Sequence, residues 1–591
     1  MTSDHPPRPR LTVNIGITGH RGLPEGAAEA VEVALDRVLG AFRSAAERLA
    51  LDEGSPFAPG EPCLLLHTPL AAGVDQIAAP IARAHRFSVR ALLPFGASEY
   101  QSDFAPGSER VAFLSQLEQA ESCLALPGAR DREHEAYLLV GQAVVAVSDI
   151  VVAIWDGEAA QGPGGTADVV ELALRSRVPV IHVVLDRERG TISDTRLLTG
   201  EARAAARSLD EADAFEQLLR ECLMPSDAAM RGHLAQFFAA RQVSRCWRIE
   251  YKLLLAMLGV KSLGAVPWRQ AGVADDIASE WSCAREHGLT GQDELERAYG
   301  WANTLAIRYA LLFRSSHVAN YALSAIAVWL ALVGLILPGA KLGFVLGELV
   351  AIGLLIANTR AGNRGDWHRR WLQYRHLAES LRPLPYLRET ALAGPPFRGQ
   401  WVEGPLKRRS GTDWTHWYAA AIWRMMHPPS GVLDESRIER LSRAATVCLI
   451  EPQATYHEKN APQMHELDHA LHRIGNTLLA AVIVVCCLFV LGYFAVPEST
   501  RANNALFVML TAGLPAIGAA VFGLRGHGEH LLAARRSARS AAHLRACAQA
   551  LEGAARPQVL ADGLESVAAV MLADLDEWTV TYQTRALEIP A

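Results

Sequence analysis

Four long apolar runs in the second half of the chain constrain the fold most strongly. They form two pairs, each joined by a short turn: Ala319–Leu337 with Leu342–Asn358, and Thr477–Val496 with Ala505–Leu524. A helix needs about 20 apolar residues to cross a hydrocarbon core, and the shortest run reaches that length if Lys341 extends to the surface. The sequence therefore predicts four membrane-spanning helices in two hairpins. The alternative, a set of buried core helices, is disfavoured because the runs contain a single charged residue, Glu348.

Basic residues flank the open ends of both predicted hairpins, whereas the two turns carry only Lys341 and Arg501 as basic residues. The flanking arginines are Arg308, Arg314, Arg360, Arg364, Arg369 and Arg370 for the first hairpin, and Arg473, Arg525, Arg535, Arg536 and Arg539 for the second. Lys and Arg accumulate in the cytoplasmic loops of membrane proteins. The sequence thus predicts a multi-pass protein of the inner membrane, with both termini and residues 359–476 in the cytoplasm.

Composition narrows the classes of partner. The net charge is −6, and no long Lys/Arg stripe occurs in the first 200 residues, which argues against a nucleic-acid partner. None of the nine cysteines lies in a CxxC or Cys/His ligand spacing. That pattern is typical of a reducing compartment and predicts no structural disulfide and no zinc or other metal site. No cofactor is expected either.

The first 190 residues alternate strand and helix patterns. The predicted strands are Leu11–Thr18, Cys63–His67, Val89–Pro94, Ser122–Leu126, Ile150–Trp155 and Val178–Leu185, and the helices between them include Glu25–Leu51, Val74–His85, Glu133–Val147 and Thr166–Ser176. Strands that alternate with helices of ten or more residues predict an α/β, Rossmann-like parallel sheet. In such sheets ligands bind at the carboxyl ends of the strands.

Glycine-rich segments follow three of these strands. The residues of interest are Gly16, Thr18, Gly19, His20 and Arg21 at the first strand, Gly73 and Asp75 at the second, and Asp156, Gly157, Gly164, Gly165, Thr166 and Asp168 at the fifth. Small residues allow a ligand to approach the backbone, and the amides of a helix N-terminus bind phosphate. Each segment alone could be an ordinary turn or cap. Because three of them end strands of one sheet, we predict a shared phosphate-binding site, with Gly162–Asp168 as its strongest element.

An aromatic segment after the third strand leaves two alternatives open. Phe95, Tyr100, Asp103 and Phe104 could form a lid over a bound base and ribose, or they could form a packed loop with a capping Asp.

The motifs Gly16-x-Thr18-Gly19-His20-Arg21, Gly73-Val74-Asp75-Gln76-Ile77-Ala78, Trp155-Asp156-Gly157 and Gly164-Gly165-Thr166-Ala167-Asp168 resemble the SLOG superfamily over roughly residues 8–190. That family consists of Rossmann-like domains that include the LOG phosphoribohydrolases and DprA-like proteins. The resemblance implies a site for a nucleotide or a nucleotide-derived ligand. Its hydrolytic members carry PGGxGTxxE, whereas here Thr166 is followed by Asp168 and only later by Glu171. The acid is at the wrong spacing, which favours ligand sensing over hydrolysis.

The rest of the chain divides into predicted helical regions. These are a connector over 191–275, a region over 276–385 that holds the first hairpin, a cytoplasmic segment over 386–476, the second hairpin over 477–524, and cytoplasmic helices over 525–591. Residues 295–385, with an amphipathic helix on each side of the first hairpin, resemble the SLATT domains, two-span effectors joined to SLOG sensors in bacterial conflict systems. The second hairpin has a similar layout, so an internal duplication is a hypothesis.

These features together predict a membrane-anchored sensor and effector of bacterial defence. A nucleotide-type ligand would bind the SLOG-like domain and cause the spans, in a homo-oligomer, to open a pore or perturb the bilayer. Glu348 is the candidate pore-lining residue, because an ionised carboxylate inside a span avoids lipid. The alternative is a membrane-tethered nucleotide hydrolase or glycosidase. A transporter ranks below both, since the spans are few and almost uncharged.

Overall fold

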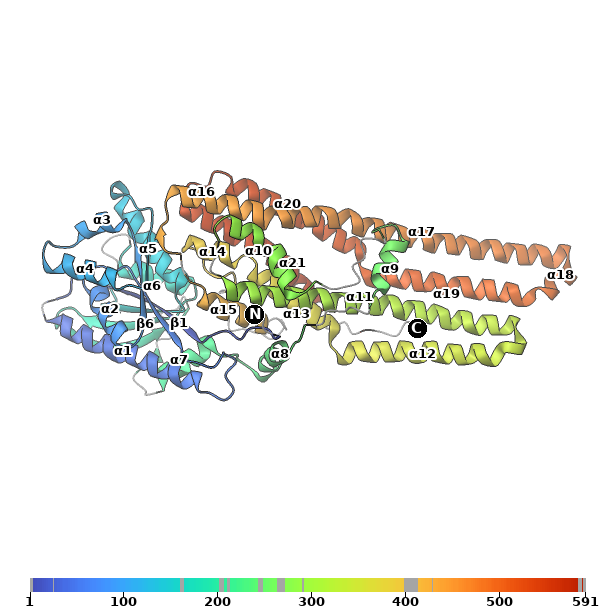
Figure 1. The fold of residues 1–591 in the computed structure, drawn as a ribbon, viewed down its shortest axis with the longest axis horizontal. Helices are drawn as coiled ribbons and strands as arrows, with labels where there is room; N and C mark the ends of the chain where they lie inside the picture. Colours follow the sequence, from blue (N-terminus) through green and yellow to red (C-terminus); the bar gives the residue numbers. More distant parts are fainter. Residues whose placement is uncertain are drawn as a thin grey trace.

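The computed structural model describes residues 4–24, 26–159, 164–200, 207–209, 213–242, 248–262, 271–289, 292–397, 413–427, 429–582 and 587. An α/β sheet domain forms one end of the molecule, a body of packed helices forms the middle, and two long helical hairpins project from the other end (Figure 1). The predicted order, a mostly parallel sheet domain followed by long apolar helices, is confirmed.

The sheet has nine strands in the order β8-β7-β6-β5-β1-β2-β3-β4-β9. Their bounds are β1 Thr12–Gly19, β2 Cys63–Thr68, β3 Ser88–Leu93, β4 Ser122–Ala125, β5 Ile150–Trp155, β6 Val180–Asp186, β7 Thr191–Leu198, β8 Arg207–Ser208 and β9 Gly431–Val432. All neighbours are parallel except the β6–β7 and β7–β8 pairs. Chain order reverses at β1, which pairs with β2 on one side and β5 on the other. The topological switch point therefore lies between β1 and β5. Sheets of this kind bind ligands there, at the carboxyl ends of the strands.

Helices cover both faces of the sheet. α1 (Ala27–Ala50), α2 (Val74–Ala84), α4 (Ser108–Glu118) and α7 (Ala214–Leu223) pack together, and α5 (Glu133–Val147) packs with α6 (Thr166–Arg175). The β1–β4 crossovers and the β5–β6 crossover run in opposite directions along the sheet. Because parallel crossovers are right-handed as a rule, the two groups of helices belong to opposite faces. The apolar strands Ile150–Trp155 and Thr12–Gly19 are consequently buried from both sides.

Two parts of the sheet differ from the prediction. Residues 191–275 were expected to be helical, but β7 and β8 continue the sheet antiparallel to β6. The β7 sequence, TISDTRLL, alternates exposed and half-buried residues instead of forming an apolar run, so it does not resemble the central strands. The segment 386–476 was also expected to be helical, yet it contributes β9, which pairs with β4. Two residues that pair across some 300 positions give no local signal in the sequence.

The helical body is built from short helices and from the inner ends of long ones. The short helices are α8 (Ala228–Phe238), α9 (Glu250–Met257), α10 (Val273–Glu286), α13 (Trp367–Leu381), α14 (Leu384–Thr390), α15 (Asp413–Met425) and α16 (Glu435–Ala444). A π-helical segment, Ala445–Ile450, joins α16 to α17. The long C-terminal helices are α20 (His530–Leu551) and α21 (Pro557–Tyr582).

Four helices are long and apolar enough to cross a membrane. They are α11 (Asp293–Ile336), α12 (Lys341–Arg364), α17 (Glu451–Ala495) and α19 (Asn504–Gly528), and they match the four predicted spans to within one residue at the ends of α11 and α17. At most 22% of the most apolar window of each is buried in the protein, so the outer hairpins expose large side chains such as Leu342, Leu491 and Phe494. Exposed apolar surface on this scale requires a lipid or protein neighbour, which indicates a multi-pass membrane protein.

The two hairpins lie side by side and contact each other through α11 and α19 (Figure 1). The Trp329 indole Nε1 donates to the Gly513 carbonyl at 3.0 Å. A side chain at Gly513 would approach the Trp329 ring to 2.9 Å, so glycine allows this contact. The turn of the second hairpin, predicted over Pro497–Asn504, contains the short helix α18 (Pro497–Ala502).

Two connections join the sheet to the helical body. At the amino ends of β1 and β5, the Arg424 guanidinium of α15 pairs with Asp149 at 2.8 Å, and Asn14 Nδ2 donates to the Arg424 carbonyl at 3.3 Å. At the sheet edge, β9 pairs with the carboxyl end of β4, and Leu433 N donates to Ala125 O at 2.8 Å. The chain continues from β9 through α16 into α17, so one strand of the sheet leads directly into a membrane helix.

A disulfide corrects the prediction from the cysteine pattern. Cys283 of α10 and Cys448 of the π-helical segment form a disulfide with a Cα–Cα distance of 5.6 Å and 165 residues between them in the sequence. His287 Nδ1 lies 3.5 Å from Cys448 Sγ, and these three residues form a group that could hold a metal ion. In the disulfide neither sulfur is a thiolate, the form that ligates metals. The oxidised group therefore offers only the imidazole nitrogen.

Candidate functional site

A cavity of about 420 Å³ opens at the carboxyl ends of β1 and β5, between α2, α5 and the start of α6. Most of the residues predicted from the glycine-rich segments line it: Thr18, Gly19, His20, Arg21, Asp75, Asp156, Gly164, Gly165 and Thr166. Three segments that are distant in sequence thus meet at the switch point, as the parallel sheet requires. The volume falls in the range of small-molecule sites.

The other predicted residues shape the loops without lining the cavity. A side chain at Gly16 would approach Ser148 Oγ to 2.5 Å, so this glycine permits packing between β1 and the end of α5. Gly73 has φ +86°, and a side chain there would lie 2.4 Å from the Arg21 carbonyl. Gly157 has φ +89°, a conformation that favours glycine. Asp168 Oδ2 accepts from Gly164 N at 2.8 Å and so fixes the loop before α6. Gly162 and Pro163 lie outside the described residues.

Charged side chains meet on the β5 side of the cavity. His20 Nε2 lies 3.2 Å from Asp156 Oδ2, and Arg187, from the turn after β6, reaches the same oxygen at 3.5 Å. Burial raises the pKa of Asp156, but the Glu158 N–H and the charges of His20 and Arg187 lower it further, so the pKa lies below its usual value. Asp156 is therefore a carboxylate that contacts both His20 and Arg187 at the cavity.

Aromatic side chains form the opposite wall. The Arg21 guanidinium lies over the Tyr137 ring, 4.1 Å from its centroid. The Tyr137 hydroxyl donates to Asp103 Oδ2 and lies 2.9 Å from Glu133 Oε1. Burial and the hydrogen bond to Asp103 raise the pKa of Tyr137, so the hydroxyl stays protonated. Tyr100 also lines this wall. The half-buried Tyr137 ring can stack on a flat ligand, whereas Tyr100 is packed in the loop after β3 and is 1% exposed.

Asp75, in the first turn of α2, is the most deeply buried acid of the cavity, with 4% of its surface exposed. Its Oδ2 accepts from Ala71 N at 3.3 Å. Burial raises the pKa of Asp75 to about 7, against the opposing effects of the Ala71 N–H and the Arg21 charge. The loop before α2, which includes Ala71, also contains Leu70, a buried non-glycine residue with φ +55°. Strain of this kind is found where the surrounding structure fixes a functional loop.

The start of α6 supplies backbone donors. Gly165 is its N-cap, and Gly165, Thr166 and Ala167 line the cavity. The first amides of a helix have no intrahelical partner and carry the positive end of the helix dipole. Gly164 has φ +83°, and a side chain there would lie 2.8 Å from Tyr137 Cβ, so the loop passes tightly against α5. This arrangement can hold a phosphate group.

The acids expected for hydrolysis do not face the cavity. Asp168 is engaged by the Gly164 amide. Glu171 pairs with Arg175 at 3.0 Å, and its side chain is 56% exposed. Among the described residues, the carboxylates that line the cavity are instead Asp75, Asp156 and Glu158.

The aromatic segment after β3 is a packed loop instead of a lid. Phe95, Tyr100 and Phe104 are each at most 2% exposed, and Phe104 stacks on Phe113 at 4.5 Å. Asp103 accepts a hydrogen bond from the Tyr137 hydroxyl and pairs with Arg130, and it does not line the cavity.

Three lining residues with functional side chains were not predicted as site residues, although Trp155 was quoted within a motif. Tyr137 lies on α5, Arg187 in the turn after β6, and Trp155 at the end of β5. Trp155 and Arg187 both follow carboxyl ends of strands, so the rule that selected the glycines could also have selected them. Tyr137 gives no such signal, because it enters the cavity through the packing of α5.

Glu348, the residue predicted to line a pore, lies on α12 and is half-buried. The neighbouring Gly347 packs towards Leu330 of α11, where a side chain would lie 3.4 Å from Leu330 Cδ1.

Comparisons with models of protein families, with curated proteins and with solved structures find no match to this chain, so the geometry of the cavity carries the functional argument.

Proposed function

We propose that the chain is a membrane-anchored sensor, whose sheet domain binds a nucleotide or nucleotide-derived signal and acts on the membrane helices. The cavity at the switch point of the sheet carries this proposal, because it combines a helix N-terminus, cationic side chains and aromatic rings. Its resemblance to SLOG domains, through Gly164-Gly165-Thr166 and the first-strand motif, points to the same ligand class.

The cavity offers a partner for each part of a nucleotide. The amides of Gly165 and Thr166 and the Arg187 charge suit phosphate. The Tyr137 ring suits a base. Asp156 can accept from ribose hydroxyls, since its pKa lies below the usual value and it is ionised.

The connections between sheet and body supply a route to the membrane. α5 lines the cavity with Tyr137 and Val144 and leads to Asp149, which pairs with Arg424 of the helical body. β9 attaches the sheet edge to the continuous helical segment Glu435–Ala495. A ligand that favours one arrangement of α5 would bias these contacts, and the size of the effect equals its differential affinity for the two arrangements.

The effector step in this proposal is a pore or a perturbed bilayer formed by a homo-oligomer, as in the SLATT-like systems of bacterial conflict. Glu348 would line the path. Replacing Glu348 with Gln should then lower ligand-triggered cation flux in liposomes without changing insertion, and unchanged flux and selectivity would remove Glu348 from the pore.

Arg187 and Arg189 provide a matched pair for testing ligand binding. Arg187 pairs with Asp156 at the cavity, whereas Arg189 in the same turn pairs with Asp186 and is 81% exposed. A charge-assisted contact to phosphate contributes about 1.5–3 kcal/mol, so Arg187→Ala should weaken binding about tenfold or more, and Arg189→Ala less than about twofold.

Calorimetry on the full chain in uncharged detergent, against adenine and guanine nucleotides and ADP-ribose, measures both variants. Equal losses in the two variants would contradict the assignment of the cavity. A parent protein that binds none of these ligands would contradict the proposed ligand class.

Membrane topology is tested by cysteine labelling from outside intact cells. In a background with Cys486 and Cys487 replaced by alanine, Gly339→Cys and Glu498→Cys lie in the exposed hairpin turns and should react with an impermeant maleimide. Glu439→Cys, on α16, should stay protected, because the basic flanks hold that side in the cytoplasm. External labelling of Glu439→Cys would overturn the orientation.

One observation favours an enzyme as the second candidate. Asp75 is a cavity carboxyl whose pKa is raised to about 7, which suits a general acid or base at neutral pH. Steady release of a product from the nucleotides above, lost in Asp75→Asn while binding persists, would establish a hydrolase. Stoichiometric binding without turnover supports the sensor.

A further inference from the structure

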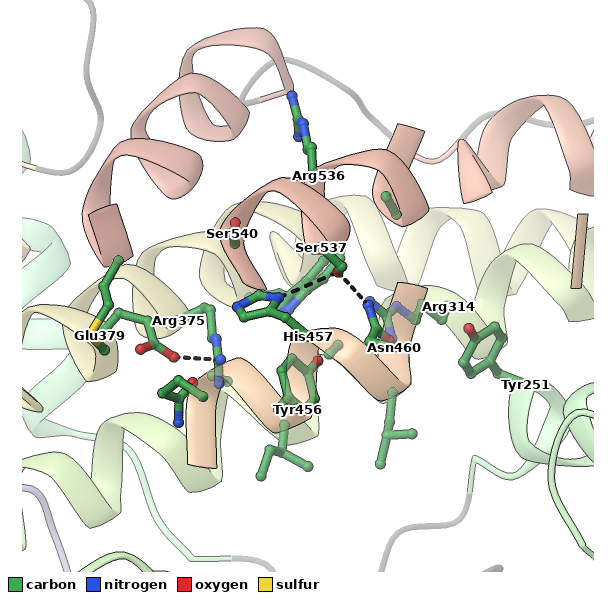
Figure 2. A pocket seen from close by; sticks show the side chains of 18 of the residues that line it. Tyr251, Arg314, Arg375, Glu379, Tyr456, His457, Asn460, Arg536, Ser537 and Ser540 are labelled. Carbon is green, nitrogen blue, oxygen red and sulfur yellow. Dashed lines mark hydrogen bonds and ion pairs between the residues drawn. The ribbon is translucent and has the colours of Figure 1, made fainter. Parts of the chain in front are cut away.

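A second cavity, of about 640 Å³, lies in the helical body where the membrane helices enter it. Its walls come from α9, α11, α13, α17, α20 and α21, which include the inner ends of both hairpins (Figure 2). The sheet domain contributes no residue to it among those described. Any molecule bound here would contact the helices that continue into the spans.

The polar side chains of this cavity are mainly basic. Lys252, Lys261, Arg314, Arg375 and Arg536 line it, whereas Glu379 is the one carboxylate among the described lining residues. Glu379 is already engaged, because Arg375 and Arg382 both pair with it. Burial raises the pKa of Glu379, but these two arginines lower it further, so its charge is committed to them. Among the described lining residues, five basic side chains therefore stand against one carboxylate, a composition that suits an anionic ligand.

Neutral donors and apolar groups complete the walls. Asn460 Nδ2 donates to Ser537 Oγ at 2.8 Å, and His457 lies 3.4 Å from the same oxygen, between α17 and α20 (Figure 2). Arg314 lies over the rings of Trp371 and Tyr251, at 4.9 and 5.4 Å from their centroids. Ile307, Leu311 and Leu544 supply an apolar side. The walls thus suit a phosphate group attached to an apolar or aromatic portion.

The position of the cavity along the helices limits the source of that phosphate. Arg314 precedes the predicted first span by five residues, about 8 Å of helix, and Asn460 precedes the third by 17 residues, about 25 Å. Lipid headgroups extend about 5–8 Å beyond the hydrocarbon core. The Arg314 end is therefore within reach of a lipid phosphate, and the Asn460 end lies in water.

From these observations we infer that the cavity is a second ligand site, which binds a phosphorylated anion at the base of the two hairpins. The site is independent of the sheet cavity and of the function proposed for it. A phosphate bound among Lys252, Arg314 and Ser537 joins α9, α11 and α20, so it stabilises one packing of the hairpins. The source is either a soluble phosphate compound or the headgroup of an acidic lipid.

The test uses the full chain with Arg187→Ala, a substitution that is expected to weaken ligand binding in the cavity of the sheet domain. The altered protein is Lys252→Gln/Arg314→Gln, and the control is Arg308→Gln, which removes a charge from the same α11 without lining the cavity. Inorganic pyrophosphate is titrated calorimetrically into each protein in uncharged detergent. The double variant should bind at least about tenfold more weakly than the background, and the control within about twofold.

A second arm identifies a lipid source. Each protein is reconstituted in bilayers of phosphatidylcholine, with or without phosphatidic acid, and the melting temperature is measured. Stabilisation by phosphatidic acid that the double variant loses assigns the site to lipid headgroups. Because Arg314 packs on two rings, Lys252→Glu on α9 serves as a second variant with less effect on packing, and it should lose the same response. The inference is overturned if neither probe binds, or if the cavity variants respond like the control.

Discussion

Replacing Arg382 with alanine is expected to lower the melting temperature of the detergent-solubilised protein by about 10 °C or more. Arg382 is 5% exposed and lies between two carboxylates. Its Nε pairs with Glu280 at 2.6 Å, its Nη1 pairs with Glu379, and its Nη2 donates to the Tyr299 hydroxyl at 2.5 Å. Removing one partner of a buried ion network leaves uncompensated charge and costs about 3–5 kcal/mol of unfolding free energy. In a domain of about 150–250 residues, each kcal/mol lowers the melting temperature by about 2–4 °C.

Two further variants separate charge from packing in this network. Arg443→Ala removes an arginine whose partner Glu439 lies at 3.0 Å with both side chains at least 65% exposed, so it should cost less than about 1 kcal/mol. In Arg382→Ala, Glu379 keeps only Arg375 of its two arginine partners. Adding Glu379→Gln removes this under-compensated buried charge and should restore part of the melting temperature. An Arg382→Ala protein that melts within about 2 °C of the parent would contradict the network.

The Arg382 network has a structural consequence for the hairpins. It ties α13 to α10 through Glu280 and to α11 through Tyr299. α11 is a single 44-residue helix, about 66 Å long, that runs from this network into the first span. α11 is therefore a continuous helical connection between this network and the first span.

The sequence predicts those strands and helices that consist of an uninterrupted run of apolar residues. The strands Thr12–Gly19 and Ile150–Trp155 are apolar runs, and the four spans hold almost no charge, so both are recognised without knowledge of the fold. β7 was missed because its alternating pattern is that of a half-exposed strand. β9 and the Cys283–Cys448 disulfide were missed because each depends on a partner more than 150 residues away.

The same distinction applies to the candidate cavity. The glycine-rich segments were predictable, since the carboxyl ends of parallel strands meet at one edge. The protonation of Asp75 was not, because it depends on how completely α2 and the loop after β2 exclude water. The second cavity could be predicted even less, since its basic residues are spread along the chain from Lys252 to Arg536.

Asp75 makes the sheet domain sensitive to pH in a direction that can be derived. Its pKa in the folded protein is about 7, above the ordinary value of 3.8. The folded state therefore holds the proton more tightly than the unfolded chain does. The stability that Asp75 contributes is fully present below about pH 4 and is lost as the pH rises through 7, by up to about 4 kcal/mol at 1.36 kcal/mol per pH unit.

Asp75→Asn should consequently stabilise the protein most at alkaline pH. The asparagine is neutral throughout, and its side-chain oxygen can still accept from Ala71 N, as Asp75 Oδ2 does at 3.3 Å. The difference in melting temperature between variant and parent should be small near pH 4, should grow as the pH rises towards 7, and should level off above pH 7. Melting curves that stay parallel across this range would show that Asp75 is ionised throughout.

The same titration distinguishes the two functions proposed for the cavity. Above pH 7 the Asp75 carboxylate repels a phosphate held by the neighbouring α6 amides, so the parent should lose nucleotide affinity as the pH rises, and Asp75→Asn should not. In a sensor the variant binds at least as well as the parent at every pH, because a neutral side chain replaces an anion. In a hydrolase the variant binds equally well but forms no product, since the group that transfers the proton is gone. Binding curves and product analysis on one pair of proteins therefore decide between the sensor and the enzyme.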